Sequence, residues 1–194
     1  MQRKMVMLYT CLYERHHTHT HRERGFTIVE LIVVIVVIAI LAAIVVVSYS
    51  WMKGDALKTR RLNDATQLQK ALEVYKTKNG EYPATGDLRC RAVSGHADSW
   101  ESSHACPSEF LSSLKPYLGS KTIVDPENSR DAHYEYFRYP AGSKGCDASR
   151  GDFYVLRIYS TKAQRFDESP GWRCDGLDWS ANPKTAYVVG GFTK

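Results

Sequence analysis

The chain has 194 residues, a formal net charge of +5 and 43% hydrophobic residues, which allows one domain of ordinary size with extensions. Much of the positive charge lies in residues 1–25 and the remainder of the chain is close to neutral, so composition does not indicate nucleic-acid binding. The sequence has no glycine-rich phosphate loop and no nucleophile motif, and we predict that the chain is not an enzyme and has no catalytic residues.

Residues 1–25 are polar and basic and contain the histidine-rich tract His16–His21. Close histidines can bind a metal, but we find no acid or thiol that completes a site, and we interpret the segment as a polar leader. A secretory signal peptide has its apolar region before the cleavage point. Here the apolar region follows Gly25, which is the wrong order for that kind of processing.

The apolar run from Phe26 to Val47 contains 22 residues, and its one charged residue is Glu30. At about 1.5 Å per residue, a helix of this length crosses the ~30 Å hydrocarbon core of a bilayer. A lone carboxylate in such a helix costs about 2.5–3.5 kcal/mol, so we interpret Glu30 as functional, with a partner to be found. The alternative is that Glu30 lies near the interface and extends its side chain to the headgroups.

The stretch Arg24-Gly25-Phe26-Thr27-Ile28-Val29-Glu30-Leu31, which heads this run, resembles the prepilin signature of type IV pilins and type II secretion pseudopilins. In those families a membrane-embedded prepilin peptidase cuts after the glycine and methylates the new N-terminal residue. The resemblance implies cleavage between Gly25 and Phe26, N-methylation of Phe26 and assembly into a helical filament. Pairing of Glu30 with the Phe26 amine, in the same or a neighbouring subunit, would offset the burial cost of both charges.

The resemblance also implies partners and a location. The implied partners are the prepilin peptidase, identical or related subunits of the filament, a membrane assembly platform and the lipid bilayer. Before processing we expect a single-pass membrane protein with a cytoplasmic N-terminus, and afterwards an extracellular or cell-surface pilus or pseudopilus. The cysteines that follow the helix set this orientation, because basic residues flank both of its ends.

The helical pattern continues into residues 53–82. Apolar side chains recur there at helical spacing on one face: Leu57, Ala65, Leu68, Leu72 and Tyr75. Asn79-Gly80 supplies a stop, so we predict one helix of about 53 residues with a weak point at Gly54. Four basic residues near the membrane exit are assigned to lipid headgroups or neighbouring subunits rather than to nucleic acid: Lys53, Lys58, Arg60 and Arg61.

The remaining residues predict a globular head. Residues 89–107 are interpreted as a loop insertion, and Phe110–Leu118 as a short amphipathic helix that Ser108 could cap. Three segments rich in β-branched and aromatic residues predict strands: Tyr134–Tyr139, Phe153–Ser160 and Thr185–Phe192. We therefore predict an α+β fold of the pilin type, with a long N-terminal helix packed on a small antiparallel sheet of three or four strands.

The predicted organisation has four parts: a leader (1–25), a transmembrane and filament-core helix (26–52), an amphipathic helix half (53–82) and the head (83–194). Four cysteines lie in the head: Cys90, Cys106, Cys146 and Cys174. They lack the close pairs of zinc sites, so we predict two disulfides and an oxidising compartment. The pairing that joins neighbours along the chain closes the shortest loops, but the sequence leaves all three pairings open.

We predict no cofactor and no metal. Major pseudopilins, which this sequence resembles, often bind calcium in an acidic C-terminal loop. The acids of this loop are scattered and form no compact cluster: Asp167, Glu168, Asp175 and Asp178. Calcium binding is therefore the less favoured alternative. We interpret His96, His104 and His133 as surface residues. Two other functions stay open, a membrane-anchored extracellular binding or enzymatic domain and a minor pilin for adhesion or DNA uptake.

Overall fold

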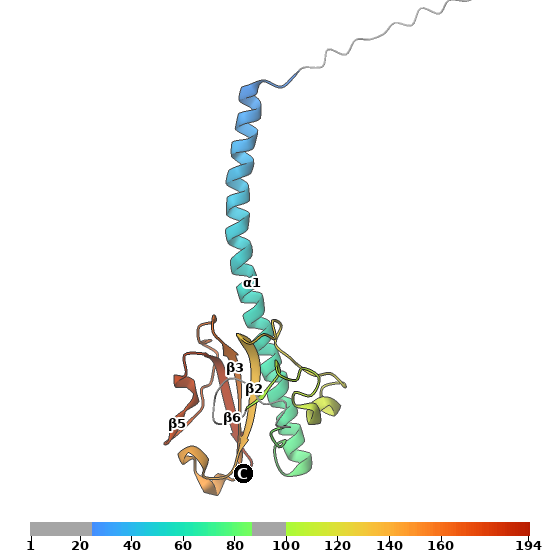
Figure 1. Ribbon diagram of the computed structural model, residues 1–194, viewed down its shortest axis with the longest axis vertical. Helices are drawn as coiled ribbons and strands as arrows, with labels where there is room; N and C mark the ends of the chain where they lie inside the picture. The colour runs from blue at the N-terminus through green and yellow to red at the C-terminus, as the bar shows by residue number, and fades with distance from the viewer. Residues whose placement is uncertain (1–24, 87–99) are drawn as a thin grey trace, which may run out of the picture. The chain divides into compact units, whose positions relative to one another are not determined.

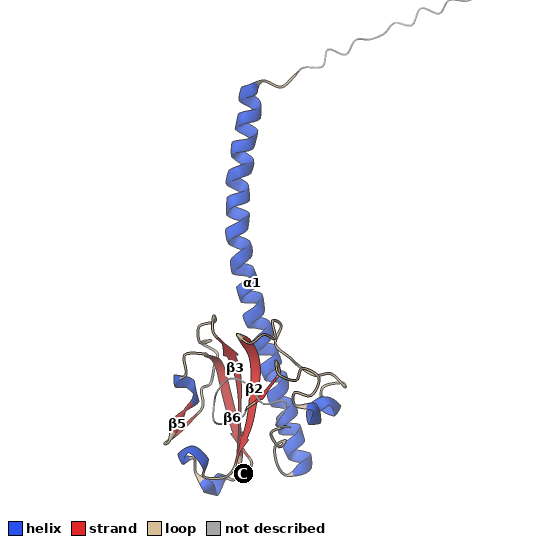
Figure 2. Cartoon of the chain, in the orientation of Figure 1, coloured by secondary structure: helices blue, strands red, loops and turns tan. Residues whose placement is uncertain are grey.

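The helix α1 occupies Ile28–Asn79, a length of 52 residues, in a computed structural model that describes residues 25–86 and 100–194 (Figure 2). The chain divides into two compact units, Met1–Val47 and Ser48–Lys194. In the first unit the described residues are essentially the apolar part of α1. Its 18-residue window Ile28–Val45 has a mean hydropathy of 3.4 and is long and apolar enough to cross a membrane.

The C-terminal end of α1 lies where the sequence predicts it. Gly80 follows the helix with a φ of +80°, and its N–H donates to the carbonyl oxygen of Lys76 at 2.7 Å. Glycine adopts this left-handed conformation without the steric cost of a Cβ atom. Lys76 and Lys78 in the last turn also suit the negative end of the helix dipole. The predicted stop at Asn79-Gly80 is confirmed.

The second unit contains a four-stranded antiparallel sheet in the order β1-β2-β3-β6 (Figure 1). Its strands are β1 (Glu101–Ser102), β2 (Ala132–Tyr139), β3 (Phe153–Ser160) and β6 (Thr185–Phe192). The strands β2 and β3 pair along their whole lengths, and β6 pairs with β3 with one irregularity in register. The three long strands coincide with the three predicted segments, and the predicted α+β fold is confirmed.

Alternating side chains divide the head into two hydrophobic cores, one on each face of the sheet. On the first face the second half of α1 buries Leu68 and Leu72 against Tyr134 and Tyr136 of β2. These contacts confirm the predicted apolar face of the amphipathic helix half, where Leu57 and Tyr75 are only half-buried. The tyrosines carry their hydroxyl groups into hydrogen bonds, as buried tyrosines usually do.

The second core is aromatic and lies under residues 161–184, which carry the small strands β4 (Arg173–Cys174) and β5 (Leu177–Asp178). Its buried aromatic residues are Trp100, Tyr139, Phe153 and Trp179. A disulfide between Cys146 and Cys174 joins the loop between β2 and β3 to this covering segment, with 4.8 Å between the two Cα atoms. The cross-link keeps a segment with little regular structure in place over the aromatic core.

The other cysteines are only partly described. Cys106 is disulfide-bonded. Cys90, its partner in the pairing that closes the shortest loops, lies outside the described residues, as does Cys11. The Cys146–Cys174 bond is nevertheless one of the pairings that the sequence leaves open.

Two short elements differ from the predictions. The strand β1 falls within the predicted loop insertion, because two residues are too short to show a period. The amphipathic helix predicted over Phe110–Leu118 is wrong as an α-helix, since the structure has a 3₁₀-helix at Ser112–Tyr117 instead. It is entered through Leu111 at a φ of +46° with no side-chain cap from Ser108, and Pro116 removes a backbone donor inside it.

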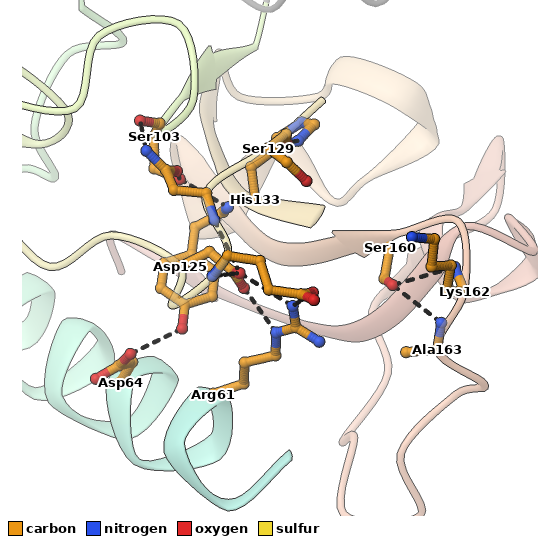
Figure 3. Close-up of polar contacts among 12 residues, drawn as sticks. Arg61, Asp64, Ser103, Asp125, Ser129, His133, Ser160, Lys162 and Ala163 are labelled. Carbon is orange, nitrogen blue, oxygen red and sulfur yellow. Dashed lines mark hydrogen bonds and ion pairs between the residues drawn. The ribbon is translucent and has the colours of Figure 1, made fainter. Parts of the chain in front are cut away.

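A buried ion pair fastens α1 to the loop before β2 (Figure 3). The guanidinium of Arg61 donates to both carboxylate oxygens of Asp125, at 2.7 and 3.0 Å, and to Glu127 at 2.7 Å. The exposed fractions of the Arg61 and Asp125 side chains are 5% and 0%. The assignment of Arg61 to lipid headgroups or neighbouring subunits is therefore wrong, because its charge is already paired within the chain.

We expect Asp125→Ala to lower the free energy of unfolding of the head by about 3 kcal/mol, the low end for breaking a buried ion pair, because it leaves the buried Arg61 guanidinium with only the partly exposed Glu127 as a counterion. Urea titration of the full chain in detergent, followed by tryptophan fluorescence, measures this loss. Glu127→Ala is the matched control, because that carboxylate is 46% exposed. It should cost less than about 1 kcal/mol. Equal losses in the two variants would contradict the burial argument.

Candidate processing and assembly site

The peptide bond between Gly25 and Phe26 lies in exposed, non-helical backbone directly before α1. Phe26 is 89% exposed, and no atom lies within 4 Å of a Cβ atom placed on Gly25. Exposed backbone outside regular structure is where proteases act most readily. The bond that the resemblance marks for cleavage is thus accessible in the folded chain.

Thr27 and Glu30 form a capping box at the beginning of α1. The hydroxyl oxygen of Thr27 accepts the N–H of Glu30 at 3.2 Å. In return, one carboxylate oxygen of Glu30 accepts the N–H and the O–H of Thr27, both at 2.8 Å. The arrangement satisfies two amide groups that a helix N-terminus otherwise leaves without partners. Thr-x-x-Glu before an apolar run is the sequence signal for this box, and our sequence reading missed it.

The capping box fixes the position of the Glu30 carboxylate. It accepts the N–H of Thr27, the residue that directly follows Phe26. Cleavage after Gly25 would place a new α-amino group one residue from an N–H that this carboxylate already binds. The arrangement thus brings Phe26, Thr27 and Glu30 together at the head of one helix. The predicted pairing of Glu30 with the Phe26 amine requires the cleaved chain and stays a prediction.

Beyond Glu30, the apolar part of α1 presents hydrophobic side chains around its whole circumference. In the isolated chain the exposed fractions of the large ones range from 48% at Val37 to 65% at Val45. A surface of this kind has to be covered, either by lipid or by other apolar helices. The helix satisfies its own backbone hydrogen bonds, so it is suited to both surroundings.

A second cluster of charges is buried in the head, on the side of the sheet that carries the aromatic core. The ring nitrogens of His133 face the carbonyl oxygen of Ser129 at 3.0 Å and the carboxylate of Glu135 at 3.1 Å. The other carboxylate oxygen of Glu135 accepts a hydrogen bond from Nε of Arg157. His133 is buried, so the interpretation of this residue as a surface histidine is wrong. His104 is exposed, as predicted, and His96 lies outside the described residues.

This cluster has the properties of a structural network. His133, Glu135 and Arg157 are each at most 4% exposed, so their charges are shielded from bulk water. The Arg157 guanidinium lies 4.4 Å from the ring centre of Trp100, which adds a cation–π contact. Buried charges that are fully partnered fix one arrangement of a core.

The described residues contain no group of three or more His, Cys, Asp or Glu side chains that could hold a metal ion. Two acids of the C-terminal loop are engaged elsewhere. Glu168 pairs with Lys58 of α1 at 3.0 Å, and Asp178 accepts the N–H of Ser180 at 2.7 Å. The expectation of no cofactor, with calcium as the less favoured alternative, stays a prediction.

We expect Glu135 to make the head less stable in acid. Burial by itself raises the pKa of Glu135, but the hydrogen bonds and charges of His133 and Arg157 outweigh it and lower this pKa below its ordinary value. The folded state then binds fewer protons than the unfolded state, so the stabilisation is complete above the unfolded pKa. It is lost as the pH falls through the folded pKa.

Urea midpoints of the full chain between about pH 7 and pH 3 measure this dependence. Glu135→Gln should flatten the acid limb of the curve and should destabilise the head at neutral pH by about 3–5 kcal/mol, because Arg157 loses its counterion. The exposed Glu109 offers a matched control, and Glu109→Gln should leave the curve unchanged. An acid limb that persists in Glu135→Gln would assign the effect to other carboxylates.

Comparison with known proteins gives a family for the N-terminal region. A profile described as "Prokaryotic N-terminal methylation motif" matches residues 20–46. The chain is 40% identical over 65 residues to the type II secretion system core protein G of Pectobacterium carotovorum subsp. carotovorum, which covers 34% of this chain and 42% of the relative. It is 42% identical over 66 residues to the protein of the same name from Escherichia coli (strain K12), covering 34% of this chain and 46% of the relative.

The protein of that name from Aeromonas hydrophila is 41% identical over 64 residues, 33% of this chain and 45% of the relative. The chain thus spans less than half the length of the curated relatives it matches. No solved structure matches the chain. The methylation profile includes Gly25, Phe26, Thr27 and Glu30, the residues that the geometry brings together. The predicted resemblance to pilins and pseudopilins is confirmed over this part of the chain.

Proposed function

We propose that this chain, which carries the N-terminal methylation motif and resembles pseudopilins over about a third of its length, is a structural subunit of a helical filament. In this proposal the prepilin peptidase cleaves after Gly25 and the new N-terminal Phe26 is methylated. The chain waits in the bilayer with its leader in the cytoplasm, and an assembly platform then transfers it into the filament. Its neighbours there are identical or related subunits, and the filament lies outside the membrane as a pseudopilus or a surface pilus.

The observation that carries the proposal is the capped Glu30 carboxylate at the head of an apolar helix. A carboxylate among lipid or among packed apolar helices is costly unless it has a partner. The hydroxyl and amide of Thr27 supply two hydrogen bonds but no opposite charge. Cleavage between Gly25 and Phe26 creates a positive amine beside this carboxylate. Processing and burial of this helix are thereby linked through one ion pair.

The filament that we favour is a secretion pseudopilus, and a type IV pilus is the second candidate. The curated relatives carry the name of a type II secretion protein, which favours the pseudopilus. These relatives match only about a third of this chain. The match therefore does not assign what the filament moves or binds.

The mature N-terminus tests the processing step. We expect mass spectrometry of the membrane-derived protein to find a chain that begins at a methylated Phe26. Gly25→Val should block cleavage, because it adds a branched side chain to the residue directly before the cleaved bond, where the prepilin signature has glycine. Gly54→Val is the matched control and should be processed normally, because it changes a glycine within α1. An intact Met1 or a cut near Ser48 would indicate an anchored extracellular domain instead.

Glu30→Ala tests the assembly step. Membrane insertion should be unchanged, because removing a charge from an apolar helix does not oppose it. Incorporation into filaments should fall at least about tenfold, because an unpaired ammonium would have to be buried at a cost of roughly 2.5–3.5 kcal/mol. Counting filaments by electron microscopy, with the membrane-inserted pool measured in parallel, gives both quantities.

Thr27 offers a matched pair of variants for the same experiment. Thr27→Val keeps the shape of the side chain but removes the hydroxyl that binds Glu30, so it should assemble less well than the wild-type chain. Thr27→Ser keeps the hydroxyl and should assemble normally. Normal filaments from Glu30→Ala would refute the role of the carboxylate in assembly.

A further inference from the structure

A groove of about 500 Å³ lies between α1 and the loop that follows β3. One wall is the stretch of α1 from Gly54 to Arg61, and the other is formed by residues 160–167. Both walls belong to the second compact unit of the chain. Neither the processing site nor the cluster of His133, Glu135 and Arg157 lines it.

Basic side chains dominate the lining of the groove. Lys162 and Arg165 are exposed, and their side chains form no hydrogen bond or ion pair with any described residue. The buried Arg61 also lines the groove, but its guanidinium is bound by Asp125 and Glu127. Lys58 also lines the groove. Two cationic groups are therefore left without a counterion in this part of the head.

Carboxylates in and around the groove are largely engaged. Glu127 lines it but binds Arg61 at 2.7 Å, and Glu168 binds Lys58 at 3.0 Å from outside it. Asp167 is the other acid of the lining. The charges of the lining that remain for a ligand are thus Lys162 and Arg165 against Asp167, a net charge of +1.

A turn holds the basic loop in place. The hydroxyl oxygen of the buried Ser160 accepts the N–H groups of Lys162 and Ala163, at 3.3 and 2.9 Å (Figure 3). In Figure 3 the hydroxyl of Ser160 and the side chain of Arg61 lie on the same side of the strand that ends at Ser160. The backbone of Lys162 is therefore fixed at the edge of the groove, while its ammonium group is free.

The groove also has an apolar side. Leu57, Ala163 and Phe166 line it, and the ammonium group of Lys58 lies 5.7 Å from the ring centre of Phe166. Cations next to an apolar wall suit a ligand that joins an anionic group to a hydrocarbon chain. A free phosphate ion would use the cations but would leave the apolar wall in water.

The position of the groove along the chain supplies the source of such a ligand. Gly54 follows Val45, the last residue of the apolar window, by only nine residues. Even a fully extended chain of that length spans at most about 30 Å, so the groove stays close to the bilayer that holds the anchor. Anionic lipids attract basic residues near the membrane surface.

We propose that this groove binds the headgroup of an anionic phospholipid, with Lys162 and Arg165 on the phosphate and with Leu57 and Phe166 against the start of the acyl chains. The inference rests on the membrane insertion in the proposed function and not on filament assembly. A headgroup held there adds a second attachment to the bilayer beside the apolar helix. Transfer into a filament would then require that this lipid be released.

Native mass spectrometry of the full mature chain in neutral detergent tests the proposal. Phosphatidylglycerol is the anionic probe, phosphatidylcholine the comparison with a neutral headgroup, and inorganic phosphate the anion without a lipid. We expect phosphatidylglycerol to bind more tightly than either. The double variant Lys162→Gln/Arg165→Gln should bind it roughly 30-fold more weakly, at about 1 kcal/mol for each basic residue near an anionic surface.

Gly54→Met separates the shape of the groove from its charge. Gly54 lines the groove and no atom lies within 4 Å of a Cβ atom placed on it, so the helix accepts a side chain at this position. This variant should also bind phosphatidylglycerol at least about tenfold more weakly with every charge retained. The control is Lys121→Gln/Arg130→Gln, which removes two exposed basic residues outside the groove and should change nothing.

Three results would overturn the proposal. Equal binding of the two phospholipids would remove the role of the anionic headgroup. Inorganic phosphate bound as tightly as phosphatidylglycerol would make the groove a site for a soluble anion. Groove variants that keep full lipid binding but fail to form filaments would make it a contact between copies of the chain. Loss of the protein from the membrane fraction would instead contradict the proposed function itself.

Discussion

The carboxylate of Glu30 is the one charge that the apolar part of α1 has to accommodate, and the functional half of the molecule depends on how this is done. The capping box solves the local problem, because the carboxylate accepts two hydrogen bonds from Thr27. It leaves the charge itself without a counterion. An apolar helix with a capped but unbalanced carboxylate is stable near a headgroup layer and costly in a dry interior.

The head treats its own buried charges differently. Arg61 and Asp125 form a complete ion pair within the chain, and Glu135 lies between His133 and Arg157. These networks need no second molecule, so they serve to fix α1 and the sheet in one arrangement. Within the described residues, the charged side chains that still lack partners are mainly exposed ones such as Lys162 and Arg165. The buried charges of the head are thus paired once the chain folds, whereas Glu30 and the exposed basic residues still lack a partner of opposite charge.

The sequence predicts the regular elements well because their signals are local. Asn79-Gly80 sets the end of α1, and runs rich in aromatic and β-branched residues predict β2, β3 and β6. It fails for Arg61, although this residue falls at helical spacing between Leu57 and Ala65, because its partner Asp125 is 64 residues away. It fails for His133 for the same reason, since the ring stacks on Tyr159 of β3, 26 residues away, with 4.7 Å between the ring centres. The capping box, in contrast, was legible in Thr27 and Glu30.

In the proposed function, cleavage after Gly25 acts as an electrostatic step as well as a release. The uncleaved chain has a carboxylate at the head of α1 and a polar, basic leader before it, and neither can enter an apolar filament core. Cleavage removes the leader and creates an ammonium group one residue before Thr27, whose N–H the carboxylate already binds. The head of the helix changes from one unbalanced negative charge to a neutral pair. Burial against other helices then becomes favourable without any change in the fold of the head, which explains how one helix can occupy a bilayer first and a filament afterwards.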